Sequence, residues 1–275
     1  MKHVKILFTL CLMFIAFDSC QKDGITPAFD EVLLSQQETQ AEETLNDLDI
    51  LVDDAINLNF GFLKSGTIVN SFYLGDCPVV TVNKTDNPQV MTIDFGTSCT
   101  GRDGKKRSGK IVVTCTAFNT FPSVRDKSFE NYFVDGKKIE GKITKTISKD
   151  QVNNIRTAVL TENVTITFPN GEGTAKRVAN LTRQYQMNNL ANKEDNQVVS
   201  WGSVEFTKVS GVKVSKAISD KTPLVFKASC HHIVSGIVSF SNSNDRKWSI
   251  DYGNGECDNK AVLTKGDITK EIKIP

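Results

Sequence analysis

From residue 67 onward the sequence alternates apolar and polar residues with a period of two, and this alternation constrains the fold more than any other feature. Gly, Asn and Asp interrupt the runs, as turns between strands require. Parallel strands need crossover segments of about a dozen residues, usually helical, and none separates these runs, so we expect antiparallel pairing. The pattern therefore predicts a mainly β body, either an antiparallel meander or a sandwich-like arrangement. The candidate strands are 77–83, 90–96, 109–119, 129–135, 138–148, 155–168, 174–187, 198–208, 223–229, 231–240, 247–252 and 268–274.

An acidic segment precedes this body. Residues 23–63 contain ten acidic residues and no Lys or Arg, whereas residues 64–275 contain 30 basic and 21 acidic residues. Thr26-Pro27 is typical of a helix start. Apolar residues then recur in steps of four and three, which marks one face of a helix: Ala41, Leu45, Leu48, Val52 and Ala55. We predict an acidic helical stem over 27–63, helical over about 27–58, whose apolar stripe packs on the basic β body at 64–275; a self-associating coiled coil is the alternative.

One phrase occurs twice in the body, as "MTIDFGTSC" at 91–99 and "WSIDYGNGEC" at 248–257. In a strand, Met91, Ile93 and Phe95 lie on one face, as do Trp248, Ile250 and Tyr252 in the second copy. We expect both triads to face the core, with Asp94 and Asp251 directed outward or capping the turn that follows. Each copy is the second strand of a predicted hairpin unit, 77–99 or 230–257.

A cysteine stands at both ends of each unit. The repeat therefore predicts disulfides Cys77–Cys99 and Cys230–Cys257, which suit an exported protein. Cys115 shares a face with Ile111 and Val113 and is predicted to be a buried free thiol.

The first residues have the layout of a bacterial secretory signal, with Lys2 and Lys5 before an apolar run from Ile6 to Phe17. That run is shorter than the roughly 20 residues needed to span a bilayer. Ser19-Cys20 after it resembles the lipobox of bacterial lipoproteins, although Phe17 and Asp18 depart from its usual pattern. The resemblance implies a signal peptide at 1–19, acylation of Cys20, and a short tether at 20–26. Gln21-Lys22-Asp23 is similar to a surface-export signal, so we expect a lipid-anchored protein on the outer membrane, exposed at the cell surface.

The body resembles the uncharacterised surface lipoproteins of Bacteroidota in two stretches, Ile93–Ile111 and "NYFVDGKKIEG" at 131–141. That family carries a lipobox and a mainly β body, and the resemblance implies no activity.

Two features are candidates for a contact surface. The stretch "GKKRSGKI" at 104–111 approaches a phosphate-binding loop, but Ile111 replaces the required hydroxyl residue and the following residues favour a strand. A basic cluster remains, which either contacts an anionic glycan, lipid or protein or is merely solvated: Arg102, Lys105, Lys106, Arg107 and Lys110. Trp201 is the second candidate, since Val204 and Phe206 belong to the other face of its strand unless Gly202 makes a bulge.

Other motifs offer little chemistry. "DFG" at 94–96 lacks the rest of the kinase signature. His231 and His232 are neighbours in a predicted strand and cannot ligate one metal together. Residues 251–258 lack the alternating oxygens of a calcium loop. We therefore expect no metal, no cofactor and no nucleic-acid partner.

Two functional classes remain open. One is a non-enzymatic surface module that binds a glycan, a lipid or a partner protein. The alternative is a hydrolase of surface glycans that uses carboxylates such as Asp94 and Asp251. Two carboxylates about 5–10 Å apart in a cleft would favour the hydrolase, whereas a large apolar face on the sheet would favour lipid binding.

Overall fold

The computed structural model describes residues 36–60, 74, 76–118, 120–150, 152–153, 155–186, 196–227, 229–230 and 232–273. The chain divides into two compact units, Met1–Ser35 and Gln36–Pro275, and all described residues belong to the second. The expected leader, Cys20, the tether and the first part of the stem lie outside the described residues. Within them, no helix combines the length and apolar character that a membrane crossing requires.

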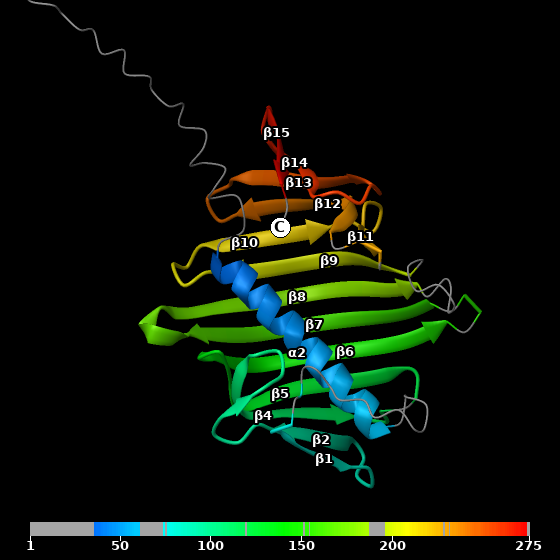
Figure 1. Cartoon of the computed structure of the whole chain (residues 1–275). Helices are drawn as coiled ribbons and strands as arrows, with labels where there is room; N and C mark the ends of the chain where they lie inside the picture. The colour runs from blue at the N-terminus through cyan, green and yellow to red at the C-terminus, as the bar shows by residue number, and fades with distance from the viewer. Residues whose placement is uncertain are drawn as a thin grey trace, which may run out of the picture. The chain divides into compact units, whose positions relative to one another are not determined.

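The described part of the chain contains one long helix, α2 (Gln36–Phe60), and fifteen strands joined in a single sheet (Figure 1). The strands are β1 (Val79–Asn83), β2 (Gln89–Asp94), β3 (Cys99–Thr100), β4 (Lys106–Cys115), β5 (Ser123–Val134), β6 (Lys137–Asp150), β7 (Ile155–Phe168), β8 (Gly173–Gln186), β9 (Gln197–Thr207), β10 (Lys213–Ile218), β11 (Leu224–Lys227), β12 (Ile233–Asn242), β13 (Lys247–Asn254), β14 (Lys260–Lys265) and β15 (Ile268–Lys273).

The strands follow one another across the sheet almost in sequence order, β1-β2-β4-β5-β6-β7-β8-β9-β10-β12-β13-β14-β15. The short β3 pairs with β4, and β11 pairs with β9 and β12. Every pairing is antiparallel, so the predicted fold class is confirmed, and the meander is the arrangement found. Because all fifteen described strands share one sheet, the sandwich-like alternative is not the one adopted.

Short turns explain this order. Asp135-Gly136 joins β5 to β6, and both residues have positive φ, 49° and 77°. That is the conformation of a type I′ turn, whose twist matches that of a hairpin. Hairpin follows hairpin, so consecutive strands become neighbours and no crossover is needed.

Helix α2 crosses one face of the sheet diagonally, from near β10 toward β2 (Figure 1). The predicted stripe, Ala41, Leu45, Leu48, Val52 and Ala55, is buried at 0–4% exposure in the main apolar core. Sheet residues such as Met91, Ile111 and Phe206 belong to the same core. The prediction that the stem packs on the β body is therefore confirmed for residues 36–60.

The sheet face turned away from α2 is polar. Along the long strands β6 and β7, residues alternate between the two faces, and Thr144, Thr146, Thr161 and Thr165 belong to the far face. These side chains are exposed or half-buried. A sheet with one buried and one solvated face is the usual antiparallel arrangement and accounts for the alternation in the sequence.

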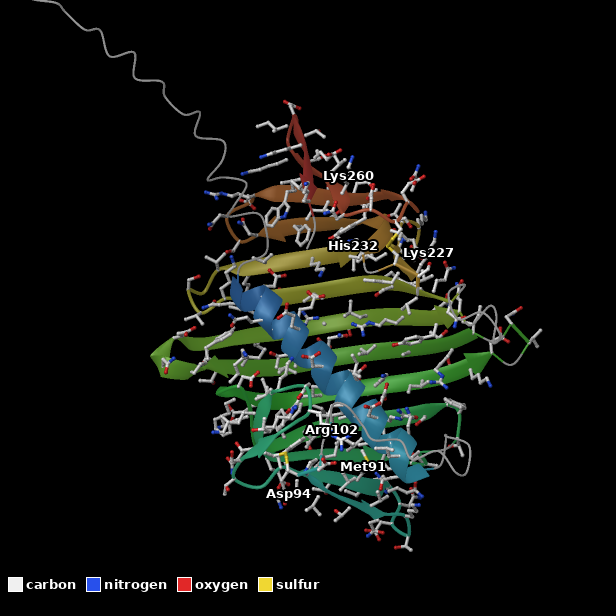
Figure 2. The ribbon with its side chains drawn as sticks, viewed as in Figure 1. Met91, Asp94, Arg102, Lys227, His232 and Lys260 are labelled. Atoms are coloured by element: carbon white, nitrogen blue, oxygen red, sulfur yellow. A yellow bond between two sulfur atoms is a disulfide. The ribbon has the colours of Figure 1, made fainter. Side chains whose placement is uncertain are left out.

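Both repeated phrases form the second strand of a disulfide-closed hairpin, as predicted. The bonds are Cys77–Cys99 and Cys230–Cys257, and Cys115 is a buried free thiol. They lie toward opposite ends of the sheet, one near Asp94 and one near His232 (Figure 2).

The inward triads are largely as expected: Met91, Ile93, Phe95, Trp248 and Ile250 are buried, and Tyr252 is half-buried. Asp94 Oδ1 accepts the backbone N–H of Gly96 at 2.8 Å, and Asp251 Oδ1 accepts that of Gly253 at 2.9 Å. The same contact from Asp to the Gly two residues later thus recurs in both copies, just after the end of β2 and at the register shift near the end of β13.

Candidate functional site: a groove between the helix and the sheet

The sheet face beneath α2 is built from side chains that the strand register places in rows across β6–β11. Three such rows run side by side at one end of the long strands. The first row is Lys149, Arg156, Tyr185, Val198 and Phe226; the second is Ile147, Ala158, Arg183, Ser200 and Leu224; the third is Lys145, Leu160, Leu181, Gly202 and Ile218.

Ion pairs hold the middle of α2 on this face. Asp49 binds the ammonium groups of Lys127 and Lys145, the latter at 2.8 Å. One turn later, Asp53 binds Arg125 at 2.9 Å and Lys145 at 2.6 Å. Lys127 and Lys145 are almost fully buried, at 0% and 2% exposure of their side chains. The charge contrast between stem and body in the sequence is therefore realised as direct contacts.

The pairing keeps these groups charged. Burial alone would raise the pKa of the Asp49 carboxyl, but the Lys127 and Lys145 ammoniums hold that pKa well below its usual range. Burial would likewise lower the pKa of Lys145, yet Asp49 and Asp53 raise it. Asp49 is thus fixed as a carboxylate and is unsuited to act as a general acid.

Further toward the start of α2, Glu42 binds the Lys216 ammonium at 3.0 Å. Burial favours the neutral form of Glu42, but Lys216 and Arg177 outweigh it and hold the pKa of Glu42 below its usual range. Glu38 is 2% exposed, and burial raises its pKa.

An apolar cavity of about 640 Å³ opens between α2 and strands β8–β11. Its apolar lining comes mainly from the sheet: Leu181, Tyr185, Val198, Val204, Ile218, Leu224 and Phe226. The helix contributes Ile50 and a polar edge that includes Glu42, Glu43 and Asp54. Phe226 is 40% exposed, so part of the apolar wall is open to solvent.

The sheet also carries a second apolar cluster in this region, composed of Ile147, Ala158, Leu160, Ala179, Leu181 and Val204, with Tyr185 packed against it. All of its members are sheet residues, whereas the apolar stripe of α2 packs into the main core. Two members of this cluster, Leu181 and Val204, also line the cavity, so the cluster forms part of the cavity wall.

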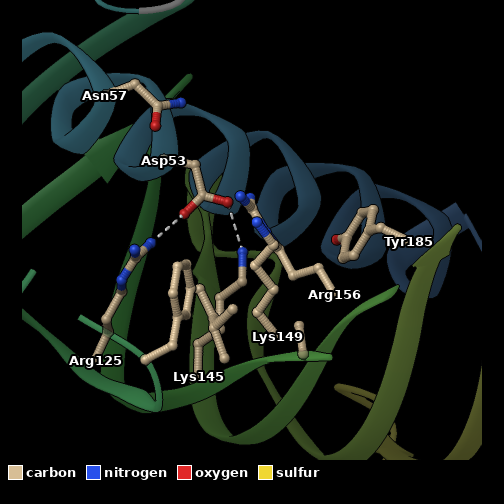
Figure 3. A pocket seen from close by; sticks show the side chains of 10 residues that line it. Asp53, Asn57, Arg125, Lys145, Lys149, Arg156 and Tyr185 are labelled. Atoms are coloured by element: carbon tan, nitrogen blue, oxygen red, sulfur yellow. Dashed lines mark hydrogen bonds and ion pairs between the residues drawn. The ribbon is translucent and has the colours of Figure 1, made fainter. Parts of the chain in front are cut away.

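A second, cationic cavity of about 300 Å³ adjoins strands β5–β8 (Figure 3). Its charged lining is Asp53, Arg125, Lys145, Lys149 and Arg156. Figure 3 shows Arg125 and Lys145 both directed at Asp53. The Arg156 guanidinium lies 5.7 Å from the centroid of the Phe121 ring, a cation–π distance.

Asp53 and Tyr185 line both cavities, so the two cavities are neighbours along the edge of α2, and we treat them as two ends of one site. We call it the helix–sheet groove. It has an apolar end over β8–β11 and a cationic end over β6 and β7. Its apolar end has the volume of a small-molecule site, which is usually about 300–1,000 Å³ and mainly apolar with a few polar groups.

The predicted basic cluster is not part of this groove, and acidic partners neutralise most of it. Arg102 binds Asp76 at 2.6 Å, Lys110 binds Asp94 at 3.1 Å, and Lys105 binds Asp47 of α2. Arg107 is buried and bound twice by Asp103. Lys106 is exposed. These contacts hold turns and the helix in place, and a contact role for the cluster stays a prediction.

Trp201 is half-buried on the sheet face away from α2. Its neighbours Ser200 and Gly202 belong to the rows beneath the helix, and the pairing of β9 runs through Gly202 without a shift in register. Gly202 therefore makes no bulge, and Trp201 shares the far face with Val199. Its role as a contact residue stays a prediction.

Asp94 and Asp251 do not form an acid–base pair. They belong to β2 and β13, with eight strands between them in the sheet. At about 4.8 Å per strand, this separates them by roughly 40 Å along the sheet. The hypothesis that these two carboxylates act together is wrong, since both cap turns instead.

The described residues contain no group of three or more His, Cys, Asp or Glu side chains arranged to hold a metal ion. His232 is half-buried before β12, and His231 lies outside the described residues. No family model, curated protein or solved structure significantly matches this chain.

Sequence reasoning did not find the groove residues. Lys149, Arg156 and Arg183 are scattered among three strands, and only the register brings them to one end of the same face. The sequence does contain one signal for them, because all three basic residues occupy positions that the period-two alternation assigns to the sheet face covered by α2.

Proposed function

We propose that this protein is a lipid-anchored surface protein of the Bacteroidota type that its sequence resembles, and that it binds an apolar ligand in the helix–sheet groove without catalysing a reaction. The observation that carries the proposal is the cavity of about 640 Å³ between α2 and β8–β11, whose lining consists mainly of apolar sheet residues. Of the three ligand classes open from the sequence, a lipid fits an apolar floor best.

The alternative hydrolase has less support. A glycosidase needs one carboxyl group that can donate a proton. At the groove, Asp49 and Glu42 are held ionised by cations, and Asp53 is bound by Arg125 and Lys145. These carboxylates dock the helix and are not available for acid catalysis.

The proposal is tested with a neutral apolar fluorophore, N-phenylnaphthylamine, and the chain from Gln21 to Pro275, which contains the whole second compact unit. Val198 lines the apolar end, while Val199 is the next residue of β9 and faces the other side of the sheet. Val198→Trp fills the groove, and Val199→Trp is the matched control.

We expect saturable binding to the wild type and to Val199→Trp, and at least a tenfold loss of affinity for Val198→Trp. Thermal unfolding of each variant establishes that it is folded. Phe226→Asp, a change at an exposed position of the same wall, gives a second variant with the same expected direction. No binding by the folded wild type, or equal binding by all variants, would refute the proposal.

A further inference from the structure

Among the residues that the structure describes, the cationic end of the groove holds more positive side chains than negative ones. Lys149 and Arg156 are directly opposite each other in the pairing of β6 with β7, and both line the cavity. Directly opposed like charges destabilise a strand pair. In the described part of the chain, no carboxylate lies within ion-pair distance of either residue.

The excess of positive charge includes the cations whose ion pairs hold α2 on the sheet. In the described ranges, the five cations Arg125, Lys127, Lys145, Lys149 and Arg156 are accompanied by two carboxylates, Asp49 and Asp53. This leaves a surplus of three positive charges at one end of the groove. Burial lowers the pKa of the Arg125 guanidinium, and the nearby positive charge of Arg156 lowers it further.

Arg183 adds a further cation beside the apolar end. It is two residues from Tyr185 on β8, and Tyr185 pairs with Arg156, so Arg183 and Arg156 are diagonal neighbours, about 7–8 Å apart in such pairs. Among the residues described, Arg183 has no carboxylate within ion-pair distance, and it lines the apolar cavity. Arg183 thus lies at the boundary between the two ends of the groove, where the edge of the helix supplies Glu42, Glu43 and Asp54.

Because one end of the groove is apolar and the other is cationic, we infer that the ligand is a single-chain amphipathic anion. It is an acyl chain that carries a carboxylate or phosphate head group. The chain lies on the floor of β8–β11, and the head group lies at the cationic end, between Lys149 and Arg156. This inference rests on the proposed function, and it adds the ligand's charge and orientation.

Charge complementarity selects this ligand over its alternatives. A neutral apolar molecule brings no charge to the opposed pair of cations, and a cationic head group is repelled at that end of the groove. A glycan has no extended apolar part for the floor formed by Leu181, Leu224 and Phe226. An amphipathic anion complements both ends, because its acyl chain packs on the apolar wall while its head group contacts the cations.

The test is displacement of the bound fluorophore by four ligands with the same alkyl chain: dodecanoate, dodecyl phosphate, dodecanol and dodecyltrimethylammonium. The double variant Lys149→Gln/Arg156→Gln removes the opposed charges but keeps polar side chains of similar length. The matched control is Lys176→Gln, an exposed cation whose position on β8 belongs to the far face.

We expect the wild type and Lys176→Gln to bind at least one of the two anions about tenfold more tightly than dodecanol, and the double variant to lose that preference. The affinity for dodecanol should stay within about twofold in all three proteins. Whichever of dodecanoate and dodecyl phosphate binds more tightly then identifies the head group.

Equal affinity of the wild type for the alcohol and both anions, or an equal loss for all ligands in the double variant, would overturn the inference. Binding of the neutral fluorophore separates the two claims. If it binds but head-group charge has no effect, only this inference fails; if it does not bind, the proposed function fails as well.

Discussion

Replacing Asp49 with Asn tests whether ion pairs, in addition to apolar packing, hold α2 on the sheet. Asp49 is the only acidic partner of Lys127 among the described residues, and the Lys127 side chain is 0% exposed. Asn has nearly the same shape but no charge, so the variant leaves a buried ammonium without a counter-charge. Lys145 keeps its contact with Asp53 at 2.6 Å, so the loss falls mainly on Lys127.

The expected cost follows from this geometry. Removing one partner of a buried ion pair destabilises a protein by about 3–5 kcal/mol, because the remaining charge is desolvated and unpaired. Replacing both partners with apolar residues of similar size is often neutral. We therefore expect Asp49→Asn to lower the free energy of unfolding by about 3–5 kcal/mol, and Asp49→Leu/Lys127→Met to recover most of that loss.

Urea unfolding followed by circular dichroism, with both disulfides intact, measures these values. Glu43→Gln is the matched control, since it removes one negative charge from an exposed position of the same helix and should change stability by less than about 0.5 kcal/mol. A loss below about 1 kcal/mol for Asp49→Asn, or no recovery in the double variant, would refute the reasoning.

Four further predictions follow from the repeated hairpins and the N-terminus. Ile93→Ala should cost about 2–5 kcal/mol in urea unfolding, and Ile250→Ala less, because Ile93 is 0% exposed within the main core and Ile250 is 5% exposed outside it. The Gly96 backbone N–H and the Lys110 ammonium hold the pKa of Asp94 below its usual range, so its contribution to stability is present at neutral pH and lost as pH falls through that pKa. The melting temperature of the wild type should thus fall more steeply than that of Asp94→Asn as pH drops below about 4, the usual pKa of an Asp, and parallel curves would exclude this linkage. In the folded protein Cys115 should resist a thiol reagent that labels it fully in denaturant, and peptide mapping should recover Cys77–Cys99 and Cys230–Cys257; labelling of the native protein would contradict the burial. Cys20→Ala should release the protein from the membrane fraction or leave it unprocessed, and fractionation identical to wild type would rule out the anchor.

The sequence predicts the strands well where alternation is strong and turns are marked. The strand expected at 155–168 is observed as Ile155–Phe168, and the dipeptide Asp135-Gly136 forms the turn between β5 and β6. The pattern does not predict three strands: β3, which has only two residues, and the longer β10 and β14. β10 and β14 are also short, and lysines flank or interrupt their apolar residues, so the period-two pattern is weak there.

The repeat predicts the disulfide-closed hairpins and the apolar stripe predicts the buried face of α2, because both depend only on the spacing of residues close together in the sequence. The capping aspartate and the cysteines recur at fixed spacing, and the stripe follows the helical period. The groove followed no local rule. It depends on where α2 crosses the sheet and on which residues the register aligns with Lys149, and both are properties of long-range pairing.

Binding of an amphipathic anion in the helix–sheet groove is tested most directly by a crystal structure of the protein with a long-chain fatty acid brominated at its terminal carbon. Anomalous scattering locates the bromine independently of how the rest of the ligand is built. We expect the bromine among Leu181, Leu224 and Phe226, with the carboxylate at Lys149 and Arg156. Bromine on the far face of the sheet, or a carboxylate at the opposite end of the groove, would contradict this expectation.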